Sequence, residues 1–153
     1  MFATMLAGGG IDVAVVASES SPQVTSISEA AIATFVGAGG KLVMSYWDLD
    51  MLAMLQSSFS FSTTTLTGAT HVVGEDTTTT PDFFGQRNHV GNPLSLSGPA
   101  FITYDHGDAI SAFGSDAITA APFTTPAGGG AIVIVSGHKV VLNGFLFNEI
   151  TPA

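Results

Sequence analysis

The feature that most constrains the fold is a strand–helix–strand pattern near the start of the chain. The apolar, β-branched stretch Ile11–Ala17 is followed by a serine-rich turn, then by a helical pattern that runs from Ser26 to the glycine-rich stop at 37–40. Lys41–Tyr46 then reads as a second strand. Two strands joined through a helix are parallel and right-handed in nearly all proteins, so we expect a βαβ unit. The continuous apolar run of the first strand predicts burial on both of its faces.

Local signals predict where the helices begin. Ser26 and Glu29 have the spacing of a capping box, in which the serine side chain accepts a hydrogen bond from the Glu29 amide and the carboxylate reaches back to the serine amide. After the second strand, Asp48 or Asp50 is placed to cap a short helix over Met51–Gln56.

The second half of the chain favours strands over helices. Threonine and serine fill 57–82, and β-branched residues lose rotamer freedom in a helix. Near the C-terminus, Ala131–Ser136 and Lys139–Leu142 flank the turn Gly137-His138 and predict a β-hairpin. Among the shorter segments, we predict strands over His71–Val73 and Phe101–Tyr104. We predict a strand or turn over Ala109–Phe113, an edge segment over Ala117–Phe123 and a loop over Pro81–Pro99.

These patterns predict one α/β domain over residues 1–153. We expect a flavodoxin-like, mostly parallel sheet with flanking helices and a β-rich C-terminal half that ends in a hairpin. A chain of 153 residues has the size of one domain. Two alternatives stay open, namely that the chain is a fragment or that it is a module of a longer protein.

Composition excludes several classes of function. Only 10% of the residues are charged and the mean hydropathy is +0.46, yet the longest apolar runs fall far short of the roughly 20 residues that span a bilayer. Three basic residues stand against twelve acidic ones, for a net charge of −9, which argues against a nucleic acid partner. The absence of cysteine excludes disulfides, thiolate metal sites and a cysteine nucleophile.

Three stretches carry a resemblance to a known family. They are IDVAVVASES, SISEAAIATFVGAGGKLVMSYWDLD and GGGAIVIVSGHKVVLNGFLFNE. Together they resemble the class I glutamine amidotransferase-like domains, in particular the trehalose-utilisation-like and beta-galactosidase-trimerisation-like branch. The resemblance covers about a third of the chain. It implies an amidotransferase-like fold for this chain.

The chain departs from this family at two places. Catalytic members have a cysteine in the sharp turn after the central strand, where this chain has Met44–Asp48, so the family's glutamine hydrolysis is excluded. The family also has a further strand and helix before the first matched strand, whereas only ten residues precede Ile11 here, and Met1–Ala7 matches the tail of that helix. Either the chain is a fragment, or its sheet begins one strand short and leaves an edge that a partner could fill.

The turn after the second strand is the first candidate site. Tyr46, Trp47, Asp48 and Asp50 combine aromatic rings with carboxylates, and Tyr46 and Trp47, together with Tyr104, could stack on a sugar ring. The alternative is that these aromatic residues belong to the core or to an interface. Ser45 lies where the resemblance would place a nucleophile, but its large neighbours do not suit a nucleophile elbow, and a strand-end hydroxyl bonded to backbone is the alternative.

Asp105, His106 and Asp108 form the densest group of potential metal ligands. Oxygen-rich loops favour hard cations, so calcium is the metal we consider, although the register of an EF-hand is absent. A solvated turn whose aspartates cap backbone amides is the alternative. No other cofactor is expected. The chain's histidines are His71, His89, His106 and His138, and their spacing matches no zinc motif.

These observations predict a non-catalytic structural module of an extracellular or cell-surface protein. We expect it to self-associate or to contact other domains of the same assembly, with no nucleic acid and no membrane span. The alternative is a carbohydrate-binding or remnant hydrolase domain that works through the Tyr46–Asp50 turn, and a third reading is a domain of a longer enzyme. The orientation of Tyr46, Trp47 and Asp48 distinguishes the first two. An open pocket that these residues line with Asp105 or a histidine favours binding, and burial against another chain favours the structural module.

Overall fold

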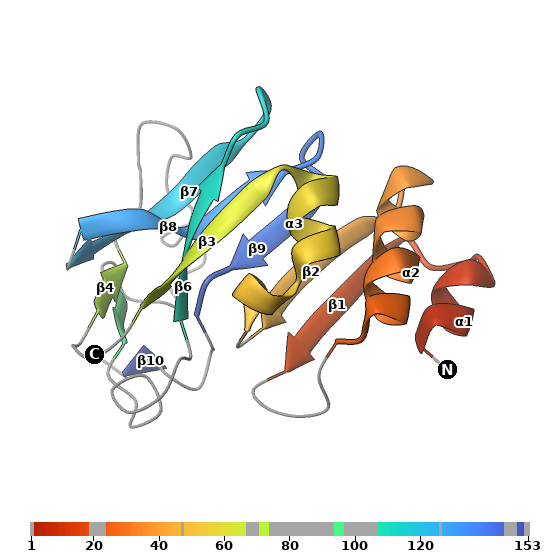
Figure 1. Ribbon diagram of the computed structural model, residues 1–153, viewed down its shortest axis with the longest axis horizontal. Helices are drawn as coiled ribbons and strands as arrows, with labels where there is room; N and C mark the ends of the chain where they lie inside the picture. Colours follow the sequence, from red (N-terminus) through yellow and green to blue (C-terminus); the bar gives the residue numbers. More distant parts are fainter. Residues whose placement is uncertain are drawn as a thin grey trace.

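A computed structural model describes residues 2–18, 24–46, 48–66, 71–73, 94–96, 107–125, 127–145 and 150–151. Figure 1 shows the fold, in which α1 (Phe2–Ala7), α2 (Ser26–Gly37) and α3 (Ala53–Phe59) lie on one face of a twisted sheet. The sheet contains ten strands within the described residues. The α/β class that the sequence predicts is therefore confirmed.

The predicted βαβ unit is present. The strands β1 (Val13–Ser18) and β2 (Lys41–Tyr46) flank α2 and pair in parallel, with Val13 opposite Lys41. A third strand, β9 (Val140–Asn143), continues the parallel order on the other side of β2, with Leu42 opposite Val140. The first three strands of the sheet are thus β1, β2 and β9, and β1 stands at the end of the order.

The rest of the sheet is antiparallel, so the expectation of a mostly parallel sheet is wrong. A parallel neighbour needs a long crossover, usually through a helix, and after α3 the described residues contain only strands. These remaining strands are β3 (Phe61–Leu66), β4 (His71–Val73), β5 (Leu94–Leu96), β6 (Gly107–Ala112), β7 (Ile118–Thr125), β8 (Ala127–Val135) and β10 (Ile150–Thr151). Each pairs with its neighbours antiparallel, and β8 is the hub that contacts β9, β7 and β6.

Several shorter predictions can be compared with this sheet. The hairpin of β8 and β9 is confirmed, with a loop over 136–139, although β10 follows it. The strand over His71–Val73 is confirmed as β4, and 109–112 belong to the strand β6. The edge assignment for Ala117–Phe123 is wrong, because β7 lies between β8 and β4. Residues 94–96 of the predicted loop form β5, while Phe101–Tyr104 lies outside the described residues.

The sheet separates two apolar cores. The larger one lies under the helices and contains Leu42 and Met44 of β2 together with Ile32 of α2. The smaller one lies on the opposite face and includes Phe123 of β7 and Phe145. Alternate side chains of the central strands therefore serve different cores, as the strand geometry requires.

The expectation that β1 is buried on both faces is wrong. Ala14 is buried beneath the helices, whereas Val13 and Val15 point to the other face and are 50% and 67% exposed. Helices cover only one face of this edge strand, so the side chains on its other face are exposed to solvent. The valine run predicted the strand correctly but not its position at the sheet edge.

The helix caps also differ from the expected ones. Thr25 caps α2 by accepting the Ser28 amide at 3.3 Å, and Glu29 does not close a capping box. The Glu29 carboxylate instead accepts the amides of Met54 and Leu55, at 3.0 and 3.3 Å, at the start of α3. These two hydrogen bonds take the place of the aspartate cap that was predicted for the helix after β2.

The segment predicted as one helix over 51–56 forms two elements. These are the 3-10 turn η1 (Leu49–Met51) and the helix α3. Asp48 occupies the N-cap position of η1, but its side chain makes no capping hydrogen bond there. Asp50 lies inside η1, and Leu52 is the N-cap residue of α3, so neither aspartate caps a helix as expected.

Candidate functional site

The described buried polar residues gather at the carboxyl ends of the parallel strands. Ser45 of β2 lies opposite Asn143 of β9, and both are buried. Asp48 follows β2, and Asp108 lies against the residue after β9. Glu29, in the first turn of α2, is the remaining buried polar residue among those described, and its charge acts on Tyr46 at the end of β2. Ligands of α/β proteins bind outside this end of the sheet, so we take it as the candidate site.

Ser45 has a structural hydrogen bond. Its hydroxyl donates to the carbonyl oxygen of Phe145 at 3.1 Å and thereby ties β2 to the chain that leaves β9. The hydroxyl is enclosed and its proton is directed at a backbone oxygen, with no imidazole in this contact to accept it. This arrangement fits the strand-end hydroxyl rather than the nucleophile.

A close backbone crossing lies beside Ser45. The Asp108 amide donates to the Gly144 carbonyl at 2.8 Å, and the Gly144 amide donates to the Ala131 carbonyl at 2.7 Å. A Cβ added to Gly144 would lie 1.9 Å from the backbone oxygen of Asp108. Only glycine allows β6 to approach β9 this closely.

Asp108 lies inside the molecule rather than in a solvated turn. Its side chain is 1% exposed and belongs to β6, while Asp105 and His106 fall outside the described residues. Within the part of the chain that the structure describes, no cluster of three or more histidine, aspartate or glutamate side chains could hold a metal ion. Calcium binding by Asp105, His106 and Asp108 stays a prediction.

Tyr46 is a core residue. Its side chain is 2% exposed in the core under the helices, and its hydroxyl accepts the Val24 amide at 3.0 Å. Burial raises the pKa of the Tyr46 hydroxyl, the Val24 bond opposes this rise, and the charges of Asp48 and Glu29 add to it. The ring is therefore not an open platform for a sugar. Trp47 lies outside the described residues.

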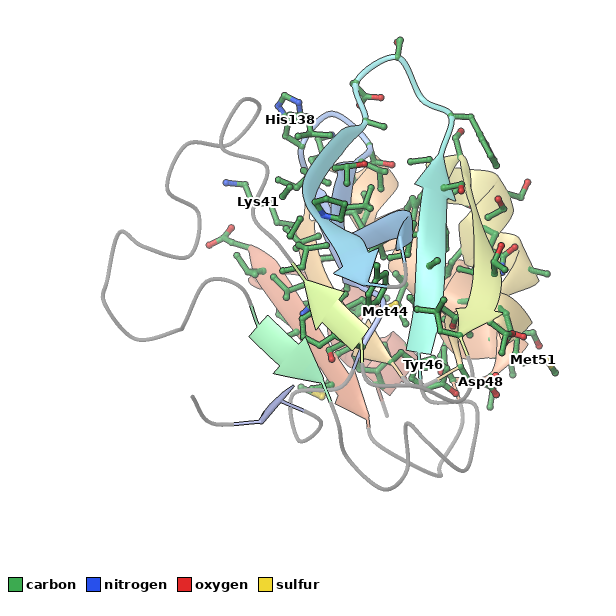
Figure 2. The ribbon with its side chains drawn as sticks, turned by 90° about the vertical axis from the view of Figure 1, so that its left-hand side faces the viewer. Lys41, Met44, Tyr46, Asp48, Met51 and His138 are labelled. Atoms are coloured by element: carbon green, nitrogen blue, oxygen red, sulfur yellow. The ribbon has the colours of Figure 1, made fainter. Side chains whose placement is uncertain are left out.

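The two aspartates of the same turn are also placed by local structure. Figure 2 shows Asp48 beside Tyr46, at the far end of β2 from Lys41. Asp48 is only 9% exposed, and its backbone carbonyl accepts the Met51 amide at 3.3 Å. One Asp50 carboxylate oxygen accepts a long hydrogen bond of 3.5 Å from the Thr65 hydroxyl of β3. The turn thus connects β2 with β3.

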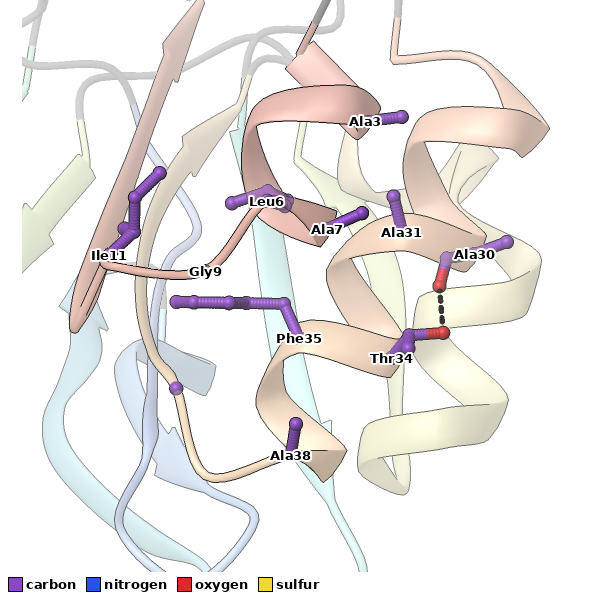
Figure 3. A pocket seen from close by; sticks show the side chains of 11 residues that line it. Ala3, Leu6, Ala7, Gly9, Ile11, Ala30, Ala31, Thr34, Phe35 and Ala38 are labelled. Carbon is purple, nitrogen blue, oxygen red and sulfur yellow. Dashed lines mark hydrogen bonds between the residues drawn. The ribbon is translucent and has the colours of Figure 1, made fainter.

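A cavity of about 550 Å³ lies between α1 and α2, and Figure 3 shows its wall. Alanine methyl groups, Leu6, Ile11 and the ring of Phe35 form most of the lining. Thr34 is the polar side chain in this lining, and its hydroxyl donates to the Ala30 carbonyl at 2.8 Å. Ligand pockets use convergent polar groups to orient a ligand, and this lining offers none that is free.

The sequence did not predict the pairing of Ser45 with Asn143 or the role of Glu29. One signal was available for Tyr46, because it shares the alternation of Leu42 and Met44, the buried residues of β2 that face the helices. Asn143 carried no signal, since its position depends on the register between β2 and β9.

Comparison with known proteins gives no relative from which a role could be transferred. No protein-family model matches the sequence, and the search of curated proteins found no match. Among the helices that the structure describes, none has the length and apolar character needed to cross a membrane.

Proposed function

We propose that this chain is a non-catalytic structural module that self-associates within an extracellular or cell-surface assembly. The observation that carries the proposal is the open side of β1. This strand ends the sheet, and its exposed face presents Val13 and Val15. Contact with a second copy at this strand would remove part of their apolar surface from water, which contributes about 25 cal/mol for each Å² covered.

The sequence of β1 supports association at this edge. Proteins that stay monomeric protect their edge strands with charged residues, proline or bulges. β1 reads VAVVAS, which contains neither a charge nor a proline, and it pairs with β2 in unbroken register. Exposed uncharged strands of this kind add to the sheet of a partner.

The buried turn after β2 supports a structural role rather than the carbohydrate-binding alternative. A sugar site needs an accessible ring and free hydrogen-bonding groups, and Tyr46 offers neither. The low share of charged residues, 10%, fits a surface that is largely covered by neighbouring copies. An amidotransferase-like origin of the domain and a cell-surface location belong to this proposal. The βαβ unit is the part of the fold that supports the amidotransferase-like origin.

Light scattering across protein concentration tests the proposal. The net charge of −9 repels copies from one another, so the measurement belongs at 0.15 M salt or above, where the screening length is about 8 Å. We expect the mean mass to rise above 15.6 kDa as concentration increases, and to rise further with salt. A mass that stays at 15.6 kDa up to millimolar concentration would contradict self-association.

A further inference from the structure

We infer that two copies of the chain join through β1 in an antiparallel pair, with a two-fold axis beside Val15. This inference rests on the proposed self-association and specifies its interface. It makes one continuous sheet out of two, with the helices of each copy on the face opposite to Val15.

The hydrogen bonds of the parallel strands fix which backbone groups of β1 point outward. The Lys41 amide donates to the Asp12 carbonyl at 2.9 Å, and on the other side of β2 the Leu42 amide donates to the Lys139 carbonyl at 2.8 Å. Backbone groups alternate sides along a parallel ladder. The even-numbered residues of β1 therefore bond to β2, and the amides and carbonyls of Val13, Val15 and Ala17 point away from it.

These outward groups are complementary to themselves. In an antiparallel pair, two residues that lie directly opposite exchange both of their backbone hydrogen bonds. If Val15 lies opposite Val15 of the second copy, Val13 lies opposite Ala17, and about six hydrogen bonds form across the edge. The same patch serves both copies, which is the requirement for a closed two-fold dimer.

Charge permits this register. The strand VAVVAS is uncharged, and the nearest acidic residues in the sequence stand just outside it, with Asp12 before the strand and Glu19 after it. In the proposed register the Asp12 residues of the two copies lie at opposite ends of the pair, roughly 20 Å apart, which exceeds the screening length at physiological salt. Across the edge, Val13 faces Ala17 and Val15 faces Val15 of the second copy, while Lys41 of β2 lies beside Val13 within one copy.

Single-cysteine variants test the register directly, because the natural chain contains no cysteine. Residues directly opposite in an antiparallel pair have Cα atoms about 5.5 Å apart, within the range that a disulfide bridges. Val15→Cys should form a disulfide dimer under mild oxidation. Val13→Cys is the matched control. Val13 is similarly exposed, but in this register it lies roughly 13 Å from Val13 of the second copy.

The expected result is that Val15→Cys cross-links at least about tenfold faster than Val13→Cys, because association holds its thiols at high effective concentration. A mixture of Val13→Cys with Ala17→Cys should give the mixed dimer. Equal rates for the two single variants, or no cross-linking of either, would overturn the inference.

A charge variant separates this interface from self-association in general. Val15→Lys places two like charges beside the axis and should lower the mean mass to that of a monomer. Ile27→Lys makes the same change of charge at a position on α2 that is 73% exposed, and should leave the mass unchanged. If Val15→Lys still associates like the natural chain, the β1 pair is wrong while self-association stands. If the natural chain is monomeric, the proposed function itself fails.

Discussion

At the scale of single residues, Gly144 shows how a missing side chain can shape a site. The backbone of Asp108 occupies the space that a Cβ at this position would need. Gly144→Ala should destabilise the protein by about 2 to 3 kcal/mol, because the clash is with backbone rather than with a flexible side chain. Chemical denaturation measures the change in the free energy of unfolding.

Gly37 provides the matched control for that substitution. It is the last residue of α2, and an added Cβ would meet nothing within 4 Å. Gly37→Ala should be neutral or should stabilise the protein by up to about 1 kcal/mol, since alanine favours a helix. Equal losses in the two variants would contradict the close crossing of β6 and β9.

Tyr46 leads to a prediction about alkaline pH. Burial raises the pKa of its hydroxyl above the ordinary 10.0, so the folded state holds this proton more tightly than the unfolded state. The contribution of this protonated hydroxyl to the free energy of unfolding is fully present below pH 10.0 and is lost as pH rises through the higher pKa of the folded state. Tyr46→Phe should therefore show a smaller fall in melting temperature above pH 10.0 than the natural chain.

The same variant should cost about 1 kcal/mol at neutral pH, because the Val24 amide loses its acceptor. An alkaline profile identical to that of the natural chain would show that Tyr46 ionises as easily in the folded state as in the unfolded one.

At the scale of elements, Glu29 joins two helices that are separate in the sequence. Its carboxylate accepts two amides at the start of α3, where a helix leaves backbone donors unsatisfied. Glu29→Ala should destabilise the protein by about 1 to 2 kcal/mol, and Glu29→Gln should cost less, because the amide oxygen can still accept these bonds. Thermal unfolding compares the two variants. Equal losses would mean that the side chain stabilises through its bulk alone.

The local elements could be predicted from the sequence, and the contacts between them could not. The first strand, α2 and the second strand are set by neighbouring residues, and their parallel pairing follows from the connection. The cap of α3 could not be predicted, because Glu29 lies 25 residues before Met54 and matches a local capping box equally well. The antiparallel part of the sheet escaped prediction for the same reason, since paired strands such as β3 and β6 are far apart in the chain.

The candidate site was predictable only in part. Alternation along β2 places Leu42, Met44 and Tyr46 on one face, so the burial of Tyr46 follows from a pattern already visible in the sequence. The depth of Asp108 depends on the passage of β6 beside Gly144, which no neighbouring residue indicates. The aromatic and acidic composition of the turn suggested a ligand, whereas the structure places Tyr46 in the core under the helices and buries Asp48.

At the scale of the whole molecule, β1 differs from the other parallel strands in two ways. Its outer edge has no neighbouring strand in the described sheet, and the side chains of Val13 and Val15 on one of its faces are exposed. The helices cover one face, the smaller core occupies the other face further along the sheet, and β1 ends the order. The absence of charge within β1 fits this association, because a second copy can cover the strand without burying an ion of it.

Amide hydrogen exchange, measured residue by residue at a low and a high protein concentration, tests association through β1 most directly. The amides of Ala14 and Val16 bond to β2 within one copy, so their protection should not depend on concentration. The amides of Val13, Val15 and Ala17 should exchange quickly in the dilute sample and become protected in the concentrated one. Protection of these three amides that is equal at both concentrations would contradict association through β1.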